Sequence, residues 1–304
     1  MDIMEKGTGS GNVSMVISPL ADPMVSAIFS SKEAAGEAAA SLIKAVLDAD
    51  DERVAIGEIL SVTSQRHYNS LNQRGCRVDV EIATAANERI IVEVQLSRSP
   101  NMLNRNLFTA ARIYSALSKP GTTSYEMERL MPKVIAINVM DKIIRKDNND
   151  VIQPVKFAYT KPPHKVVESK FMMYAVQLQR IEEMEPDFSK AWYCWLNALY
   201  KAEKMKMPLQ EVVEMSQELK EFASKDVGFR QFCDLFERAA SDPDVQSDYM
   251  NWIVTRMREE DMLQGAREEG IEEVAMNMLQ AGMAPEAVKE LTGLSLERIS
   301  ELSK

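Results

Sequence analysis

The sequence predicts an α/β domain with the element order αβββαβ, followed by an all-α region. Three observations carry this prediction: two strand patterns between Arg77 and Ser99, helical patterns on either side of them, and a near absence of strand patterns after Pro163. Strands alternate with period two or form short apolar runs, whereas helices repeat their apolar residues about every 3.6 positions. The chain of 304 residues is long enough for one large domain or two smaller ones.

The first elements are a leader, a helix and a strand. Residues 1–15 are rich in Gly and Ser and show no period, which predicts a mobile leader. The segment Asp22–Leu47 is helical, with Pro23 in the first turn and Gly36 as a candidate break. A first strand is expected over Ile56–Thr63, followed by a connecting loop over residues 67–75.

Two strands joined by a polar turn come next. The first, Val78–Ile82, alternates apolar and polar side chains, and the second, Ile90–Leu96, is apolar except for Glu93 and Gln95. Residues two apart in a strand leave the same face, so these two side chains point together. If the strands pair through the turn, Asp79 lies close to Glu93.

Two carboxylates that converge on an apolar sheet repel each other, and burying them unpaired is costly or forces protonation. A divalent cation removes both problems, and hard oxygen ligands with open positions suit Mg²⁺ or Mn²⁺. The acid pair Asp79 and Glu93 therefore predicts a metal site. With such a site, Glu81 is expected to lie away from the metal, at the surface. The alternative to a metal site is an amphipathic hairpin whose polar face is solvated.

A helix and an apolar strand follow the hairpin. Asn101–Ser118 has a 3.6-residue period, Lys133–Met140 is a continuous apolar strand typical of a doubly buried position, and Phe157–Tyr159 is a candidate edge strand. Beyond Pro163 we expect only helices. Their predicted ranges are Ser169–Glu185, Phe188–Glu203, Leu209–Ala223, Phe229–Ala240, Asp248–Glu273, Ile271–Gln280, Pro285–Thr292 and Leu296–Ser303.

These patterns predict four segments. They are a flexible leader over 1–15, the α/β domain over 16–163, a helical region over 164–247, and a charged helix with a small helical unit over 248–304. The charged helix has a thin apolar stripe, which suggests an exposed or coiled-coil arm.

Composition limits the partners and the compartment. The net charge of −10 argues against indiscriminate nucleic-acid binding, although a local basic groove is compatible with it. No apolar run is long enough to cross a bilayer and no leader of the secretory type is present, so we expect a cytoplasmic protein without a membrane partner. Cys76, Cys194 and Cys233 form no CxxC pair, which fits reduced thiols.

The spacing Asp79-x13-Glu93-x-Gln95 resembles the motif of the PD-(D/E)XK nuclease superfamily: an Asp, a variable gap, then Glu or Asp-x-Lys on the next strand. More closely, the chain resembles the Rpn-type branch of recombination-promoting nucleases and transposases, in which Gln often replaces the Lys. The flanking matches follow in chain order: Asp22 and Phe29, then Arg105, Phe108 and Tyr114, then Gly121 and Tyr125, then Pro132–Ile135.

The resemblance implies a restriction-endonuclease-like fold with a central mixed sheet, and a DNA endonuclease that hydrolyses phosphodiester bonds with Mg²⁺ or Mn²⁺ in recombination, transposition or defence. It implies that Asp79, Glu93 and the backbone carbonyl of Val94 bind the cation. Gln95 would orient the attacking water, but it supplies no positive charge and cannot act as a base.

Further site residues are less constrained. The superfamily often adds an acid from the first helix, for which the candidates are Glu37, Glu33 and Asp22. Glu58, on the expected first strand, is a further candidate for this acid. The candidates for phosphate binding are Arg105, Arg98 and Arg112, of which the first and last are seven apart and share a helix face. For Arg112 a solvated helix face is the alternative.

The end of the chain resembles a helix–turn–helix pair, with Gly293 at the turn. Its second helix is not basic, because Arg298 and Lys304 are matched by Glu297 and Glu301. We therefore expect it to serve packing or homo-oligomerisation through the C-terminal helices rather than DNA reading. An alternative function follows from the missing Lys, the acidic charge and the charged helix: a catalytically weak or inactive nuclease-fold protein that acts as an interaction or oligomerisation module.

Overall fold

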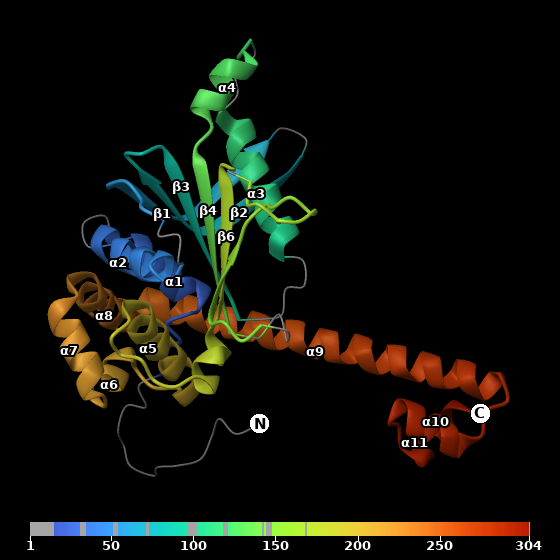
Figure 1. Ribbon diagram of the computed structural model, residues 1–304. Helices are drawn as coiled ribbons and strands as arrows, with labels where there is room; N and C mark the ends of the chain where they lie inside the picture. Colours follow the sequence, from blue (N-terminus) through green and yellow to red (C-terminus); the bar gives the residue numbers. More distant parts are fainter. Residues whose placement is uncertain are drawn as a thin grey trace. The chain divides into compact units, whose positions relative to one another are not determined.

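The computed structural model describes residues 15–30, 35–50, 54–70, 73–96, 102–117, 121–141, 143, 148–167 and 169–303. The expected leader, apart from Met15, and two candidate site residues, Glu33 and Arg98, lie outside these ranges. Contacts divide the chain into two compact units, Met1–Tyr249 and Met250–Lys304 (Figure 1).

The first unit is built on a mixed sheet (Figure 1). This sheet has six strands in the order β1-β2-β3-β4-β6-β5. The strands β1, β2 and β3 are antiparallel, β3, β4 and β6 are parallel, and β5 returns antiparallel at the edge. The strand bounds are Ile59–Ser70 (β1), Gln73–Thr84 (β2), Glu88–Gln95 (β3), Lys133–Met140 (β4), Ile152–Val155 (β5) and Phe171–Gln177 (β6).

The helices before β5 are α1 (Asp22–Ser30), α2 (Ala35–Leu47), α3 (Met102–Leu117) and α4 (Ser124–Leu130). The helix α3 covers one face of the sheet, where Ala110 and Ile113 pack against Ile91 and Ala136. On the alternate positions of the same strands, the side chain of Ile137 is also buried. Both faces of the central strands are therefore covered, as the continuous apolar pattern predicts.

The element order αβββαβ is confirmed, but one element was assigned to the wrong class. The expected helix Ser169–Glu185 is instead the strand β6 followed by a 3-10 helix, Leu178–Glu183. The sequence FMMYAVQ has residues that favour helices, and its pairing beside β4 in the sheet overrides that preference. The sheet thus includes residues beyond 163, where we expected the α/β domain to end.

Two boundaries also differ. The loop expected over residues 67–75 is wrong, because β1 continues to Ser70 and β2 begins at Gln73. The hairpin is polar because β1 is an edge strand, and edge strands commonly carry polar side chains. The edge strand expected over Phe157–Tyr159 is also wrong. The strand at this edge is β5, Ile152–Val155, and Ala158 forms only an isolated bridge.

The later helices of the first unit are α5 (Ala191–Met205), α6 (Leu209–Glu214), α7 (Gln217–Lys225) and α8 (Val227–Ala240). Figure 1 shows them gathered beside α1 and α2, and α2 packs against α5 and α8. The rings of Trp195 and Phe229 stack edge to face between α5 and α8, with centroids 4.8 Å apart.

The helix α9 runs without a break from Pro243 to Gln280, so the separate helix expected over Ile271–Gln280 is wrong. In the second unit, α9 is followed by α10 (Pro285–Thr292) and α11 (Leu296–Leu302), which share a small core of Ala275, Val288 and Ile299. Gly293 ends α10 with φ of 76°, a conformation that favours glycine. No helix in the described ranges is both long and apolar enough to cross a membrane.

Candidate active site at a fork in the sheet

The sheet forks at the acid pair. The β2–β3 pairing ends at Val80↔Val92. Towards its beginning β2 remains paired with β1 only, while β3 continues beside β4 as far as Gln95. Continuing the antiparallel register by one residue places Asp79 opposite Glu93, where the strands separate, and the charge of Asp79 acts on Glu93.

Asp79 takes the place of a backbone partner at this fork. Its carboxylate accepts a hydrogen bond of 2.9 Å from the backbone N–H of Val94. This N–H lies beyond the end of the β2–β3 ladder, so the side chain of Asp79 replaces a backbone carbonyl of β2 as its acceptor. Only 8% of the residue is exposed. Burial raises the pKa of Asp79, the charge of Asp22 raises it further, and the hydrogen bond from Val94 acts in the opposite direction. The proximity predicted for Asp79 and Glu93 is therefore present.

Glu93 is the most deeply buried acid of the site, at 2% exposure. Burial first, and then the negative charge of Asp79, raise the pKa of Glu93 to about 8. Arg105 on α3 lowers this pKa, because its guanidinium donates a hydrogen bond of 2.9 Å to Oε2 of Glu93. A backbone N–H from Asp79 acts in the same direction. The pair is held by reciprocal backbone contacts across the fork.

The last residue of β3, Gln95, is half-buried and its backbone carbonyl accepts a hydrogen bond of 3.1 Å from the N–H of Asp141. The β3–β4 ladder has no register shift, so Gln95 leaves the sheet on the same face as Glu93. The ladder also pairs Glu93 with Asn138, which sequence analysis missed. Asn138 could have been singled out from the sequence, because it is the one amide side chain in the apolar run KVIAINVM.

The three candidate arginines have different surroundings. Arg105 is ion-paired with Glu93, although 49% of its side chain is exposed and can face a further anion. Arg112 stacks over the ring of Phe108, with its guanidinium carbon 5.0 Å from the centroid. Arg98 lies outside the described residues.

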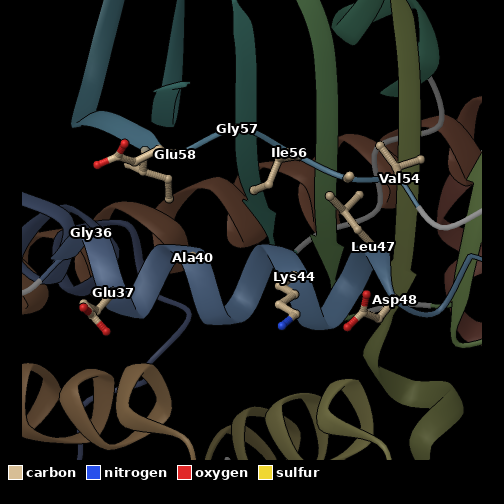
Figure 2. A pocket seen from close by; sticks show the side chains of 12 residues that line it. Gly36, Glu37, Ala40, Lys44, Leu47, Asp48, Val54, Ile56, Gly57 and Glu58 are labelled. Carbon is tan, nitrogen blue, oxygen red and sulfur yellow. The ribbon is translucent and has the colours of Figure 1, made fainter. Parts of the chain in front are cut away.

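The candidates for the additional acid separate into two groups. Asp22, at the start of α1, acts electrostatically on both Asp79 and Glu93. Glu37 and Glu58 instead line a pocket of ≈ 780 Å³ between α2 and the segment that leads into β1, and neither Asp79 nor Glu93 lines it (Figure 2). Both of these acids are exposed.

Glu81 was expected at the surface, and this is wrong. It is 6% exposed, and its carboxylate accepts hydrogen bonds from the hydroxyl of Tyr68 and from Arg89. These two hydrogen bonds provide partners for the buried carboxylate of Glu81 without a metal ion. We therefore assign Glu81 a structural role beside the fork.

The donor set fits a hard divalent cation. Within the described ranges, no group of three His, Cys, Asp or Glu side chains lies close enough to hold a metal ion. Mg²⁺ is commonly held by only one or two carboxylates, with water and substrate phosphate completing its shell. Burial raises the pKa of both acids, and the charge of Asp79 raises the pKa of Glu93 further. The pair matches that requirement, since a cation would relieve both effects.

The first unit is an α/β protein domain whose mixed sheet carries two buried acids at a fork between its strands. The family model described as PD-(D/E)XK nuclease family transposase matches residues 19–264. The chain therefore belongs to this family. A second model, the C-terminal HTH domain of the Rpn/YhgA-like nuclease family, matches residues 268–304. No curated protein and no solved structure matches the chain.

Proposed function

We propose that this protein is a metal-dependent DNA endonuclease that hydrolyses phosphodiester bonds in recombination, transposition or defence. The observation that carries the proposal is the buried pair Asp79 and Glu93 at the fork, beside the half-exposed Arg105. Family membership supports the reaction class, and the free cysteines suit a reducing cytoplasm.

Each residue has a task in this proposal. Asp79, Glu93 and the backbone carbonyl of Val94 would hold Mg²⁺ or Mn²⁺, which would supply an activated water and neutralise charge on the scissile phosphate. Arg105 donates to a phosphate oxygen from the exposed side of its guanidinium. Asp22 is the best-placed additional acid, because its charge already acts on both members of the pair.

Gln95 is proposed to orient the attacking water by hydrogen bonds. We expect Gln95→Lys to leave the cleavage rate unchanged or to raise it by about tenfold or more, because a cation near the phosphate stabilises developing negative charge and ~1.4 kcal/mol corresponds to tenfold. Gln95→Ala should lower the rate without abolishing Mn²⁺ binding. Single-turnover nicking rates and calorimetric Mn²⁺ affinities check this pair of variants. Wild-type rates in both variants would show that Gln95 does not face the reaction.

The direct test of the function is nicking of supercoiled plasmid by the purified full-length protein. We expect nicking with Mg²⁺ or Mn²⁺, and its loss after chelation with EDTA and recovery on re-addition of the metal. Nicking that persists in EDTA, or a complete absence of nicking at millimolar Mn²⁺, would contradict the proposal.

The second unit is proposed to contribute DNA contacts and self-association. Its match to an HTH domain supports DNA binding. Arg298, in the second helix of the pair, is engaged by Glu272 and Glu301, which favours a packing role for that side chain. An assembly role without catalysis remains the second candidate function, and it is favoured by the Gln in place of Lys and by the net charge of −10.

A further inference from the structure

One buried side chain near the fork has no structural explanation. Asn138 lies in β4, whose neighbouring residues are apolar. It is 0% exposed, and in the described part of the chain neither its Oδ1 nor its Nδ2 has a hydrogen-bond partner. Burying an amide without partners is unfavourable, because the lost hydration is not replaced. A valine or leucine would avoid this cost, so sheet packing alone does not account for asparagine.

The position of Asn138 connects it to the candidate metal centre. The parallel β3–β4 ladder pairs Asn138 directly with Glu93. Directly paired residues of neighbouring strands have their side chains on the same face, with Cβ atoms about 5 Å apart. The ionised carboxylate of Glu93 has no hydrogen-bond donor and two acceptor oxygens. Arg105 donates a hydrogen bond to one of them, Oε2. A buried donor without a partner thus lies beside the most deeply buried acceptor of the site.

We propose that Asn138 is a positioning residue of this centre: its Nδ2 donates a hydrogen bond to the carboxylate of Glu93 when that carboxylate binds a divalent cation. This inference rests on the proposed function. Carboxylate ligands are oriented by hydrogen bonds to their remaining oxygen, and loss of such a bond commonly lowers metal affinity 10–100-fold. A neutral amide suits this position, because a third acid would repel the pair and an apolar side chain has no donor.

A structural role and a positioning role predict opposite results. A structural asparagine stabilises the fold, so its removal lowers stability and leaves metal affinity unchanged. A positioning asparagine without partners contributes nothing to the fold in the absence of metal. Its replacement by an apolar residue of suitable shape therefore maintains or raises stability and weakens metal binding.

The test compares Asn138→Val and Asn138→Thr, which have the same shape and differ in a hydroxyl donor. In the full-length protein we expect Asn138→Val to lower Mn²⁺ affinity 10–100-fold in calorimetric titration and Asn138→Thr to lower it less. Thermal unfolding in EDTA should show both variants at least as stable as wild type. Val139→Ala, at the next and equally buried position, is the control: it should lose stability and retain Mn²⁺ affinity.

The outcomes separate this inference from the proposed function. If wild type and Asn138→Val bind Mn²⁺ equally, the positioning role is overturned and the metal centre stands. If wild type itself binds no Mn²⁺ at millimolar concentration, the metal centre is overturned and the inference with it. Loss of stability with unchanged affinity would assign Asn138 to the fold.

Discussion

Replacing Asp79 by Asn is expected to lower the rate of metal-dependent plasmid nicking by at least about 10³-fold. The substitution removes one of two negative charges that hold the cation, and the cation supplies several kcal/mol of transition-state stabilisation, at ~1.4 kcal/mol per tenfold in rate. The fold should survive, because the amide oxygen of Asn can still accept the hydrogen bond from the N–H of Val94. Nicking rates and circular dichroism of the purified variant measure the two effects.

The matched controls are Glu37→Gln and Glu58→Gln, which neutralise exposed acids that line the separate pocket (Figure 2). Both should cut plasmid at the wild-type rate. Equal nicking by wild type and Asp79→Asn would exclude the fork as the reaction centre. A loss of activity in Glu58→Gln would transfer the role of extra acid from Asp22 to that residue.

Replacing Glu93 by Gln is expected to stabilise the protein at pH 8 in the absence of divalent cations. The pKa of Glu93 is raised from the model-compound value of 4.5 to about 8, chiefly by burial and then by Asp79. The folded state therefore retains a proton that the unfolded state loses. The contribution of this carboxyl to stability is complete below pH 4.5 and is lost progressively as the pH rises to about 8. The full loss amounts to roughly 5 kcal/mol, at ~1.4 kcal/mol per pKa unit.

Gln does not ionise, so the Glu93→Gln variant does not lose this stability as the pH rises. Denaturant unfolding at several pH values in EDTA should show its advantage over wild type growing between pH 5 and pH 8. Saturating Mn²⁺ should reverse the order, because a ligand that binds only the folded state stabilises it and the variant binds the cation poorly. An unfolding free-energy difference independent of pH would show that Glu93 is ionised in the folded protein.

The hairpin and its acid pair were accessible from the sequence because they depend on local patterns. The strands β2 and β3 are adjacent in the chain, and their alternation and turn define the register that places Asp79 beside Glu93. The continuous apolar run of β4 likewise predicted a strand buried on both faces, and its bounds, Lys133–Met140, are confirmed.

The predictions failed where the outcome depends on distant partners. The segment Phe171–Gln177 mixes residues that favour helices with residues that favour strands, and it becomes a strand because β4 offers it a paired, buried position. Glu81 is buried because Tyr68, thirteen residues away, and Arg89 reach its carboxylate. Neither contact leaves a periodic signal in the chain.

Motif spacing and periodicity encode the family, the order of elements in the α/β core and the proximity of the two acids, so these could be predicted from the chain alone. Three features of the site became visible in the folded protein: Arg105 pairs with Glu93, Asp22 acts on the acid pair whereas Glu37 and Glu58 line a separate pocket, and Asn138 pairs with Glu93 across the β3–β4 ladder. The physical reason is that burial and electrostatic coupling depend on which side chains the parallel crossover and the fork bring together, and those side chains are far apart along the chain.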